Sequence, residues 1–131
     1  GESGRLFMAH LPEEEVKACL KEMLPDLDEF PGTIMDEDAI LQELKNVREK
    51  EYCISKMEVS HDGVGIAAPI RDYKGTMIAA ISLVGPANRI VDERIPKLIS
   101  IVVKGARQIS NLLGFVNIIY DSPSTLASNP K

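Results

Sequence analysis

The chain has 131 residues, the length of one domain with one sizeable core, and 44% of them are hydrophobic and 27% charged, as in ordinary globular proteins. Its formal net charge of −5 and its lack of tryptophan argue against direct contact with nucleic acid, which usually takes a basic face or an aromatic stacking platform. No apolar run approaches the ~20 residues of a membrane helix, and Cys19 and Cys53 have no CxxC spacing. We therefore expect a soluble cytoplasmic protein with free thiols and no membrane partner.

Two helices are expected at the start of the chain. The segment SGRLFMAHL, residues 3–11, forms a short one, and Pro12 then stands at the start of the next, where its missing N–H costs nothing. This second helix, EEEVKACLKEML over residues 13–24, has acidic residues in its first turn and an apolar stripe at helical spacing. The stripe consists of Val16, Cys19, Leu20, Met23 and Leu24.

A third helix is expected after a loop at residues 25–33 that contains two prolines and a glycine. Asp36 is a good N-cap for it, and Met35 and Ile40 are placed as a hydrophobic staple. The helix, EDAILQELKNVREK, runs to about Lys50. Its core-facing residues are Ile40, Leu41, Leu44 and Val47.

Three strands follow in the middle of the chain. The first is YCISKMEV, residues 52–59, which is rich in β-branched and aromatic side chains. The other two, GVGIAAPI at 63–70 and TMIAAISLV at 76–84, are joined by RDYKG. Asp72 and Gly75 suit the first and fourth positions of a type I turn, so these two strands are predicted to form a hairpin.

A long amphipathic helix closes the ordered part, with Asp92 as its expected cap, Pro96 in its first turn and Gly114 as its C-terminal stop. Its expected core residues are Leu98, Ile99, Val102, Val103, Ala106, Ile109, Leu112 and Leu113. Residues 116–131 are expected to be a loosely ordered tail. The element order predicts an α+β fold with an antiparallel sheet flanked by helices. Three strands are few for four helices, so either a partner completes the sheet or the chain is a fragment.

Three blocks of sequence then point to a family. They are SGRLFMAHLPEEEV, YCISKMEVSHDGVGIAAPIRDYKGTMIAAISLVGPANRI and ARQISNLLG, in that order. Together they resemble the effector-binding domain of IclR-family transcriptional regulators, in which a GV-x-C-IAAPI-x-D-x-x-G-x-x-x-AAISI-x-GP-x-x-R core precedes a final helix ending IS-x-x-LG. The similarity covers Ser3 to Gly114 and is most specific between Glu58 and Arg89.

The resemblance implies a GAF-like fold, over residues 3–115, whose pocket senses a small organic metabolite and which here lacks the first strands of the family's sheet. In the family this domain follows a winged helix-turn-helix that binds operator DNA as a dimer or tetramer. Operator DNA would therefore be a partner only through an N-terminal reader absent from this chain. Neither a cofactor nor an enzymatic activity is implied.

The resemblance also indicates residues around the effector pocket. Ser3 and Gly4, with Gly1 and Glu2 before them, fall in the loop before the first helix, where the N–H groups at the helix start at Arg5 would suit a carboxylate. Ser55 falls where some members have an acidic residue that contacts the ligand. Gly65 falls where many have a cysteine, and Ile66 follows it in the same pocket-lining stretch.

The last two expected pocket residues lie on the third strand. Ser82 matches the first serine of the family's SIS pattern, and Val84 replaces the second. They are two residues apart, so they share one face of the strand. The departures at Gly65 and Val84 remove two polar contacts that members use for small keto-acids, which predicts a roomier and more apolar pocket.

Other interpretations of the polar residues are weaker. His61, near Glu58 and Asp62, suggests a metal site, but its spacing follows no known ligand pattern and a polar turn explains it more simply. His10 ends an apolar stripe and is expected to be a packing histidine. We therefore predict no metal site. No GxSxG elbow accompanies Ser82, so no catalytic residue is predicted either.

Three hypotheses therefore remain open. The first is a metabolite-sensing effector domain that also self-associates as a dimer or tetramer. The second is a pure oligomerisation module whose pocket is vestigial. The third is a small enzyme on a GAF-like scaffold.

Overall fold

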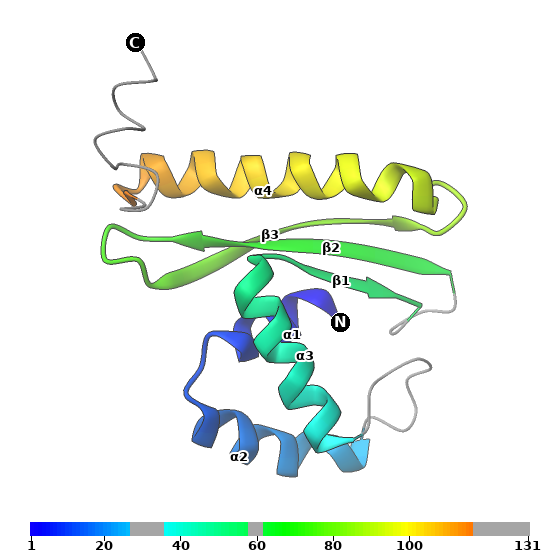
Figure 1. The fold of residues 1–131 in the computed structure, drawn as a ribbon, viewed down its shortest axis with the longest axis vertical. Helices are drawn as coiled ribbons and strands as arrows, with labels where there is room; N and C mark the ends of the chain where they lie inside the picture. The colour runs from blue at the N-terminus through cyan, green and yellow to red at the C-terminus, as the bar shows by residue number, and fades with distance from the viewer. Residues whose placement is uncertain (27–35, 58–61, 117–131) are drawn as a thin grey trace.

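The computed structural model describes residues 1–26, 36–57 and 62–116 (Figure 1). The α-helices are α1 (Glu2–Ala9), α2 (Glu13–Met23), α3 (Glu37–Lys50) and α4 (Ile95–Leu112). The strands are β1 (Cys53–Lys56), β2 (Gly63–Arg71) and β3 (Met77–Pro86). Two short 3₁₀ helices, η1 (Leu24–Asp26) and η2 (Asp92–Arg94), follow α2 and precede α4. The expected order of helices, strand, hairpin and helix is confirmed.

The three described strands form one antiparallel sheet in the order β1-β2-β3. Ala67 of β2 pairs with Cys53 on one side and Ser82 on the other. The sheet lies between two helical layers: α4 runs across one face, and α1, α2 and α3 lie on the other (Figure 1). This is the predicted α+β architecture.

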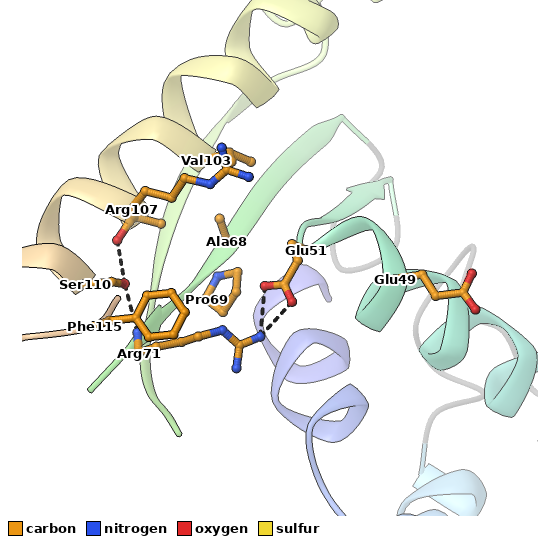
Figure 2. A pocket seen from close by; sticks show the side chains of 10 residues that line it. Glu49, Glu51, Ala68, Pro69, Arg71, Val103, Arg107, Ser110 and Phe115 are labelled. Carbon is orange, nitrogen blue, oxygen red and sulfur yellow. Dashed lines mark hydrogen bonds and ion pairs between the residues drawn. The ribbon is translucent and has the colours of Figure 1, made fainter. Parts of the chain in front are cut away.

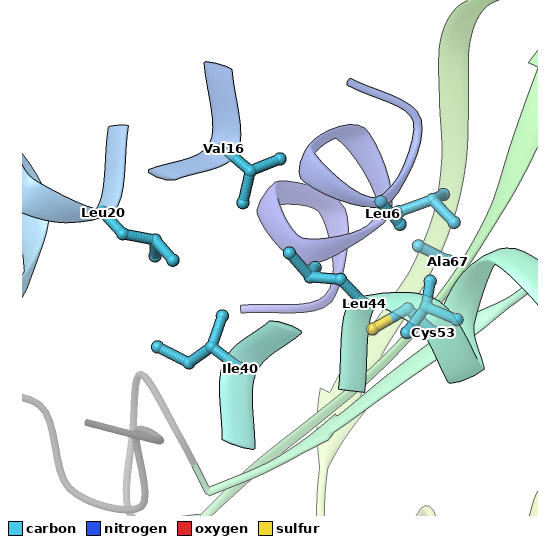
Figure 3. Close-up of a cluster of buried hydrophobic side chains, with 9 residues drawn as sticks. Leu6, Val16, Leu20, Ile40, Leu44, Cys53 and Ala67 are labelled. Atoms are coloured by element: carbon cyan, nitrogen blue, oxygen red, sulfur yellow. The ribbon is translucent and has the colours of Figure 1, made fainter. Parts of the chain in front are cut away.

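The layer of α1, α2 and α3 buries the first of the cores (Figure 3). Its apolar residues recur at three- and four-residue spacing along each helix, which places them on one side. They meet the small Ala67 and the thiol of Cys53 on the sheet, both almost fully buried. The cluster consists of Leu6, Ala9, Val16, Leu20, Ile40, Leu44, Val47, Cys53 and Ala67. Met23 is an exception to the expected stripe of α2, since it is 42% exposed.

The second layer, α4, packs on the opposite face of β2. Ile66, Ala68 and Ile70 alternate with the residues that face α1 and contact Val102 and Ala106 of α4. Because helices cover both faces of β2, every residue from Val64 to Ile70 is buried. This double cover explains why the strand is apolar without alternation.

The expected stripe on α4 is wrong at its C-terminal end. Ile109, Leu112 and Leu113 are exposed, and Ser110 is buried in their place. The buried line runs through positions 102, 106 and 110, each four residues apart. Ile109, Leu112 and Leu113 lie outside this buried line and face solvent.

The turn and caps predicted from local chemistry are present. The Asp72 carbonyl accepts a hydrogen bond from the Gly75 N–H at 3.0 Å, and Gly75 has the left-handed φ of +81° that glycine permits. The Asp36 carboxylate accepts from the Ala39 N–H at 2.9 Å at the start of α3. Gly114, with φ +87°, follows the end of α4. The Met35 half of the expected staple and residues 117–131 of the expected tail lie outside the described residues.

Several boundaries differ from those predicted. α1 ends at Ala9, short of position 11, and β3 extends to Pro86, beyond position 84. Two further differences have a clear physical cause. The first strand ends at Lys56, short of position 59, because Met57 takes a left-handed φ of +53° that an extended strand does not allow. Asp92 does not cap α4, whose N-cap is Arg94. Asp92 instead begins the 3₁₀ helix η2, and its carboxylate pairs with the Lys56 ammonium at 2.8 Å, which ties this turn to β1.

Candidate functional site

The expected pocket residues on the strands gather on the sheet face that α1 covers. In the register, Ser55 pairs with Gly65 and Gly65 pairs with Val84, while Ser82 pairs with Ala67. Directly paired residues of antiparallel strands point to the same face. Ala67 contacts Leu6 of α1 in the first core, which identifies that face. We call Ser55, Gly65, Ser82 and Val84 the α1 face.

Ile66 does not belong to this group. Its side chain is fully buried on the opposite face, where it packs beneath α4 with Val102 and Ala106. Successive residues of a strand point to opposite faces, so Gly65 and Ile66 cannot line the same pocket with their side chains. The structure therefore gives Ile66 a packing position on the α4 side.

The loop expected before the first helix is already helical. α1 begins at Glu2, with Gly1 as its N-cap, and the Arg5 N–H bonds the Gly1 carbonyl at 3.2 Å. Ser3 and Gly4 therefore lie in the first turn of α1. This agrees with the helix expected over residues 3–11, but not with a loop that reaches a helix start at Arg5. The first turn is next to the α1 face, so Ser3 still meets the sheet.

Two hydrogen bonds join the first turn of α1 to the two outer strands. The Ser55 hydroxyl of β1 donates to the Glu2 carboxylate with an O···O distance of 2.7 Å, and Ser55 is only 6% exposed. The hydroxyls of Ser3 and Ser82 lie 2.8 Å apart. α1 is thereby held to β1 by Glu2 and to β3 by Ser3.

Gly65 of the central strand lies between these bonds. A Cβ added to it would overlap the carboxylate of Glu2, so glycine is what allows Glu2 to lie there. The apolar enlargement expected at Gly65 is therefore not what the structure shows, because a carboxylate takes the space. Val84, across from Gly65, is 68% exposed and leaves this end of the α1 face open to solvent.

The side chains of Glu2 and Arg5 make contacts at this site that the sequence did not predict. The Arg5 guanidinium donates to the Ile54 carbonyl at 2.6 Å and lies 3.6 Å from the Glu43 carboxylate, so it anchors α1 to both β1 and α3. The sequence offers one signal for these contacts: Glu2 and Arg5 are three residues apart at the start of an amphipathic helix, which places them on the same side of it. It does not say what either side chain meets across the sheet.

A separate cavity of about 340 Å³ lies between α4 and the end of α3, beside the end of β2 (Figure 2). At its floor, one nitrogen of the Arg71 guanidinium donates to both oxygens of Glu51, at 2.8 and 2.9 Å. The same nitrogen lies 3.0 Å from Nε2 of His10, whose Nδ1 donates to the Leu6 carbonyl at 2.8 Å. His10 thus has the structural role expected of it, as part of a network that joins α1, α3 and β2.

Three further observations bear on the other interpretations. Within the described ranges, no group of three or more His, Cys, Asp and Glu side chains is arranged to hold a metal ion; His61 lies outside those ranges. Cys19 and Cys53 are both free thiols. None of the helices in the described ranges is long and apolar enough to cross a bilayer.

Residues 1–111 match the model of a protein family described as bacterial transcriptional regulator IclR, C-terminal. Among curated proteins, the HTH-type transcriptional regulator KipR of Bacillus subtilis (strain 168) is 31% identical over 115 residues, which are 88% of this chain and 46% of KipR. The chain spans less than half the length of the curated relatives that it matches. These relatives are transcriptional regulators rather than enzymes.

Solved structures of transcriptional regulators are also similar to this chain. The C-terminal domain of the E. coli regulator KdgR has a TM-score of 0.72 and 29% identity, and the match covers 86% of this chain and 68% of that one. An inducer-binding domain of PobR from Acinetobacter, a double mutant in complex with 3-hydroxybenzoic acid, has a TM-score of 0.75 over 86% of this chain and 64% of its own; at 24% identity it shows the fold alone. The chain belongs to the IclR family of bacterial transcriptional regulators, within its C-terminal domain.

Proposed function

We propose that this chain is the small-molecule-sensing and self-association domain of an IclR-type regulator, and that effector binding changes the affinity of the full-length protein for operator DNA. The observation that carries the proposal is the meeting of polar side chains from α1 and the sheet. Glu2 bonds Ser55 and Ser3 bonds Ser82, both at positions where the family resemblance expects effector contacts.

The proposed mechanism is a shift between two arrangements of α1 on the sheet. A ligand that bonds the Ser82 hydroxyl replaces its contact with Ser3 and so changes how the first turn of α1 is held. An effector changes such an equilibrium only by binding the two arrangements with different affinity. Couplings of this kind are typically about 1–3 kcal/mol, or roughly 5- to 150-fold in affinity.

A thermal-shift screen of this chain against a metabolite panel tests the proposal. A ligand at about a hundred times its Kd stabilises the folded state by about 2.7 kcal/mol, which raises the melting temperature by several degrees. Replacing Ser82 by alanine is expected to weaken a hit by about 1 kcal/mol, because one hydrogen bond to the ligand is lost.

The matched control is Ser100→Ala, on the exposed side of α4, which is expected to leave binding unchanged. If no compound of the panel raises the melting temperature of the wild-type chain, sensing is excluded. If Ser82→Ala and Ser100→Ala bind a hit alike, Ser82 does not contact the ligand.

A second candidate, a pure oligomerisation module, is favoured by the exposed end of α4. Ile109, Leu112 and Leu113 are three and four residues apart, so they lie on one side of the helix, and Leu112 is 88% exposed. Self-association through this side would bury them. Size-exclusion chromatography with light scattering is expected to show a smaller particle for Leu112→Lys than for the wild type. A module without sensing would lose its assembly in this variant and bind no compound of the panel.

A further inference from the structure

The position of the Glu2 carboxylate goes beyond a contact between a helix and a sheet. It accepts a hydrogen bond from the buried Ser55 hydroxyl at 2.7 Å, and it fills the place where a side chain at position 65 would begin. β2 offers no side chain there, because residue 65 is glycine. The negative charge therefore lies directly against the backbone of the central strand, in the middle of the proposed effector site.

No lysine or arginine side chain in the described ranges pairs with this carboxylate. The nearest cation along α1, Arg5, instead interacts with the Ile54 carbonyl and the Glu43 carboxylate. A carboxylate has about four lone-pair positions, and Ser55 occupies one of them. Glu2 is only half-buried, so its remaining acceptor positions can be reached by a ligand that binds next to Gly65.

We infer that Glu2 is a specificity-determining residue, which selects effectors that present an amine or a hydroxyl donor at Gly65 and rejects those that present a carboxylate there. The inference rests on the proposed function of this site. An N–H or O–H group of the ligand completes the hydrogen bonding of Glu2, and a cationic amine adds charge attraction. A second carboxylate would face a like charge in a partly buried place, and such repulsion is a common source of selectivity.

Ser55 supports this assignment. Its hydroxyl is committed as a donor to Glu2, so it can only accept from a ligand. Glu2 and Ser55 together thus present acceptors to the site. The hydroxyls of Ser3 and Ser82 bond each other, and either one can be the donor. This pair can therefore also accept a hydrogen bond from the ligand. The side chains of Glu2 and Ser55 therefore favour a hydrogen-bond donor on the part of the ligand that lies next to Gly65.

Matched pairs of compounds on one carbon skeleton test the inference. Suitable pairs are 3-hydroxybenzylamine with 3-hydroxybenzoate, and ethanolamine with glycolate, added to the metabolite panel sorted into amines, polyols and acids. Calorimetry and thermal shift are expected to show binding of amines or polyols, and at least tenfold weaker binding of the matching acids, to the wild-type chain. In Glu2→Gln, the affinity for the amine is expected to fall at least tenfold and that for the acid to rise.

Glu2→Gln preserves the shape of the side chain and can still accept from Ser55, so folding is expected to be retained. Glu14→Gln, an exposed glutamate in the first turn of α2, is the charge-matched control and is expected to bind like the wild type. Gly65→Ala is the second variant, because its Cβ forces the Glu2 carboxylate out of the site. Gly105→Ala, whose Cβ would meet Ile81 at an ordinary 3.8 Å, is its control.

The outcomes distinguish the role of Glu2 from the sensing function of the whole site. If acids bind the wild type as tightly as they bind Glu2→Gln, Glu2 does not set specificity, although the site still senses small molecules. If an amine binds the wild type, Glu2→Gln and Gly65→Ala with equal affinity, Glu2 likewise does not set specificity. If no compound of any class binds either the wild type or Glu2→Gln, the proposed function fails and the inference fails with it.

Discussion

Ser110 shows how a single polar residue can be essential to the packing of a helix. It is 2% exposed, although it lies on an amphipathic helix where leucine or isoleucine would be expected. Its hydroxyl accepts from the Arg71 N–H at 2.9 Å and donates to the Ala106 carbonyl at 2.8 Å. β1 pairs with β2 only as far as Ala67, so the N–H at the far end of β2 is satisfied by α4 instead.

Replacing Ser110 by alanine is therefore expected to destabilise the fold. The variant leaves the Arg71 N–H buried without this acceptor, which costs about 1–3 kcal/mol. Urea denaturation would measure the change in the free energy of unfolding. Ser100→Ala, the same change at an exposed position of α4, is expected to shift it by less than about 0.5 kcal/mol. Equal effects of the two substitutions would show that the bond to Arg71 contributes nothing.

Among the elements, α3 is the one whose limits follow most directly from local chemistry. Its bounds, Glu37–Lys50, are those predicted, and the Asp36 cap is in place. α3 ends at Lys50, and its C-cap Glu51 has a left-handed φ of +63° and a carboxylate that pairs with Arg71. The residue that begins α3 is thus bonded locally, whereas the residue that follows its end also pairs with another element.

The cap predicts a measurable loss of stability. Asp36→Ala removes the acceptor for the Ala39 N–H and is expected to lower the free energy of unfolding by about 1 kcal/mol. Asp38→Ala, an exposed acidic residue in the first turn of α3, is the control and is expected to cost about 0.3 kcal/mol or less through the helix dipole. Circular dichroism during thermal unfolding would compare the two. A loss in Asp38→Ala as large as that in Asp36→Ala would assign the effect to charge rather than to the cap.

At the scale of the whole molecule, one sheet carries buried clusters on both of its faces. Leu44 belongs to the cluster between α3 and the sheet, and Val102 to the cluster beneath α4; each is 4% exposed. The clusters share no residue, but β2 contributes alternate side chains to both. Unfolding of β2 would therefore remove both cores at once, which predicts one cooperative transition.

Single and double substitutions test this coupling. Leu44→Ala is expected to cost about 2–5 kcal/mol and Val102→Ala about 1–3 kcal/mol. The double variant is expected to be additive within about 0.5 kcal/mol, because the two sites share no neighbour, and to unfold in one transition. Ile101→Ala, at a 52% exposed side chain, is the control with little expected loss. Two separate transitions in denaturant would show that the layers unfold independently.

Local patterns determined much of this protein from the sequence alone. The element order, the Asp36 cap, the Asp72–Gly75 turn and the family were all predicted, because each depends on residues close together in the chain or on a motif of fixed spacing. Strand periodicity likewise placed Ser82 and Val84 on one face.

Only the tertiary structure decided which side chains meet. It brought Glu2 against Gly65 and Ser55, and it buried Ser110 while leaving Leu112 exposed. These outcomes depend on the pairing register and on how α1 and α4 dock. A helical or strand period specifies a face, but it does not specify which residue lies opposite that face when two elements pack.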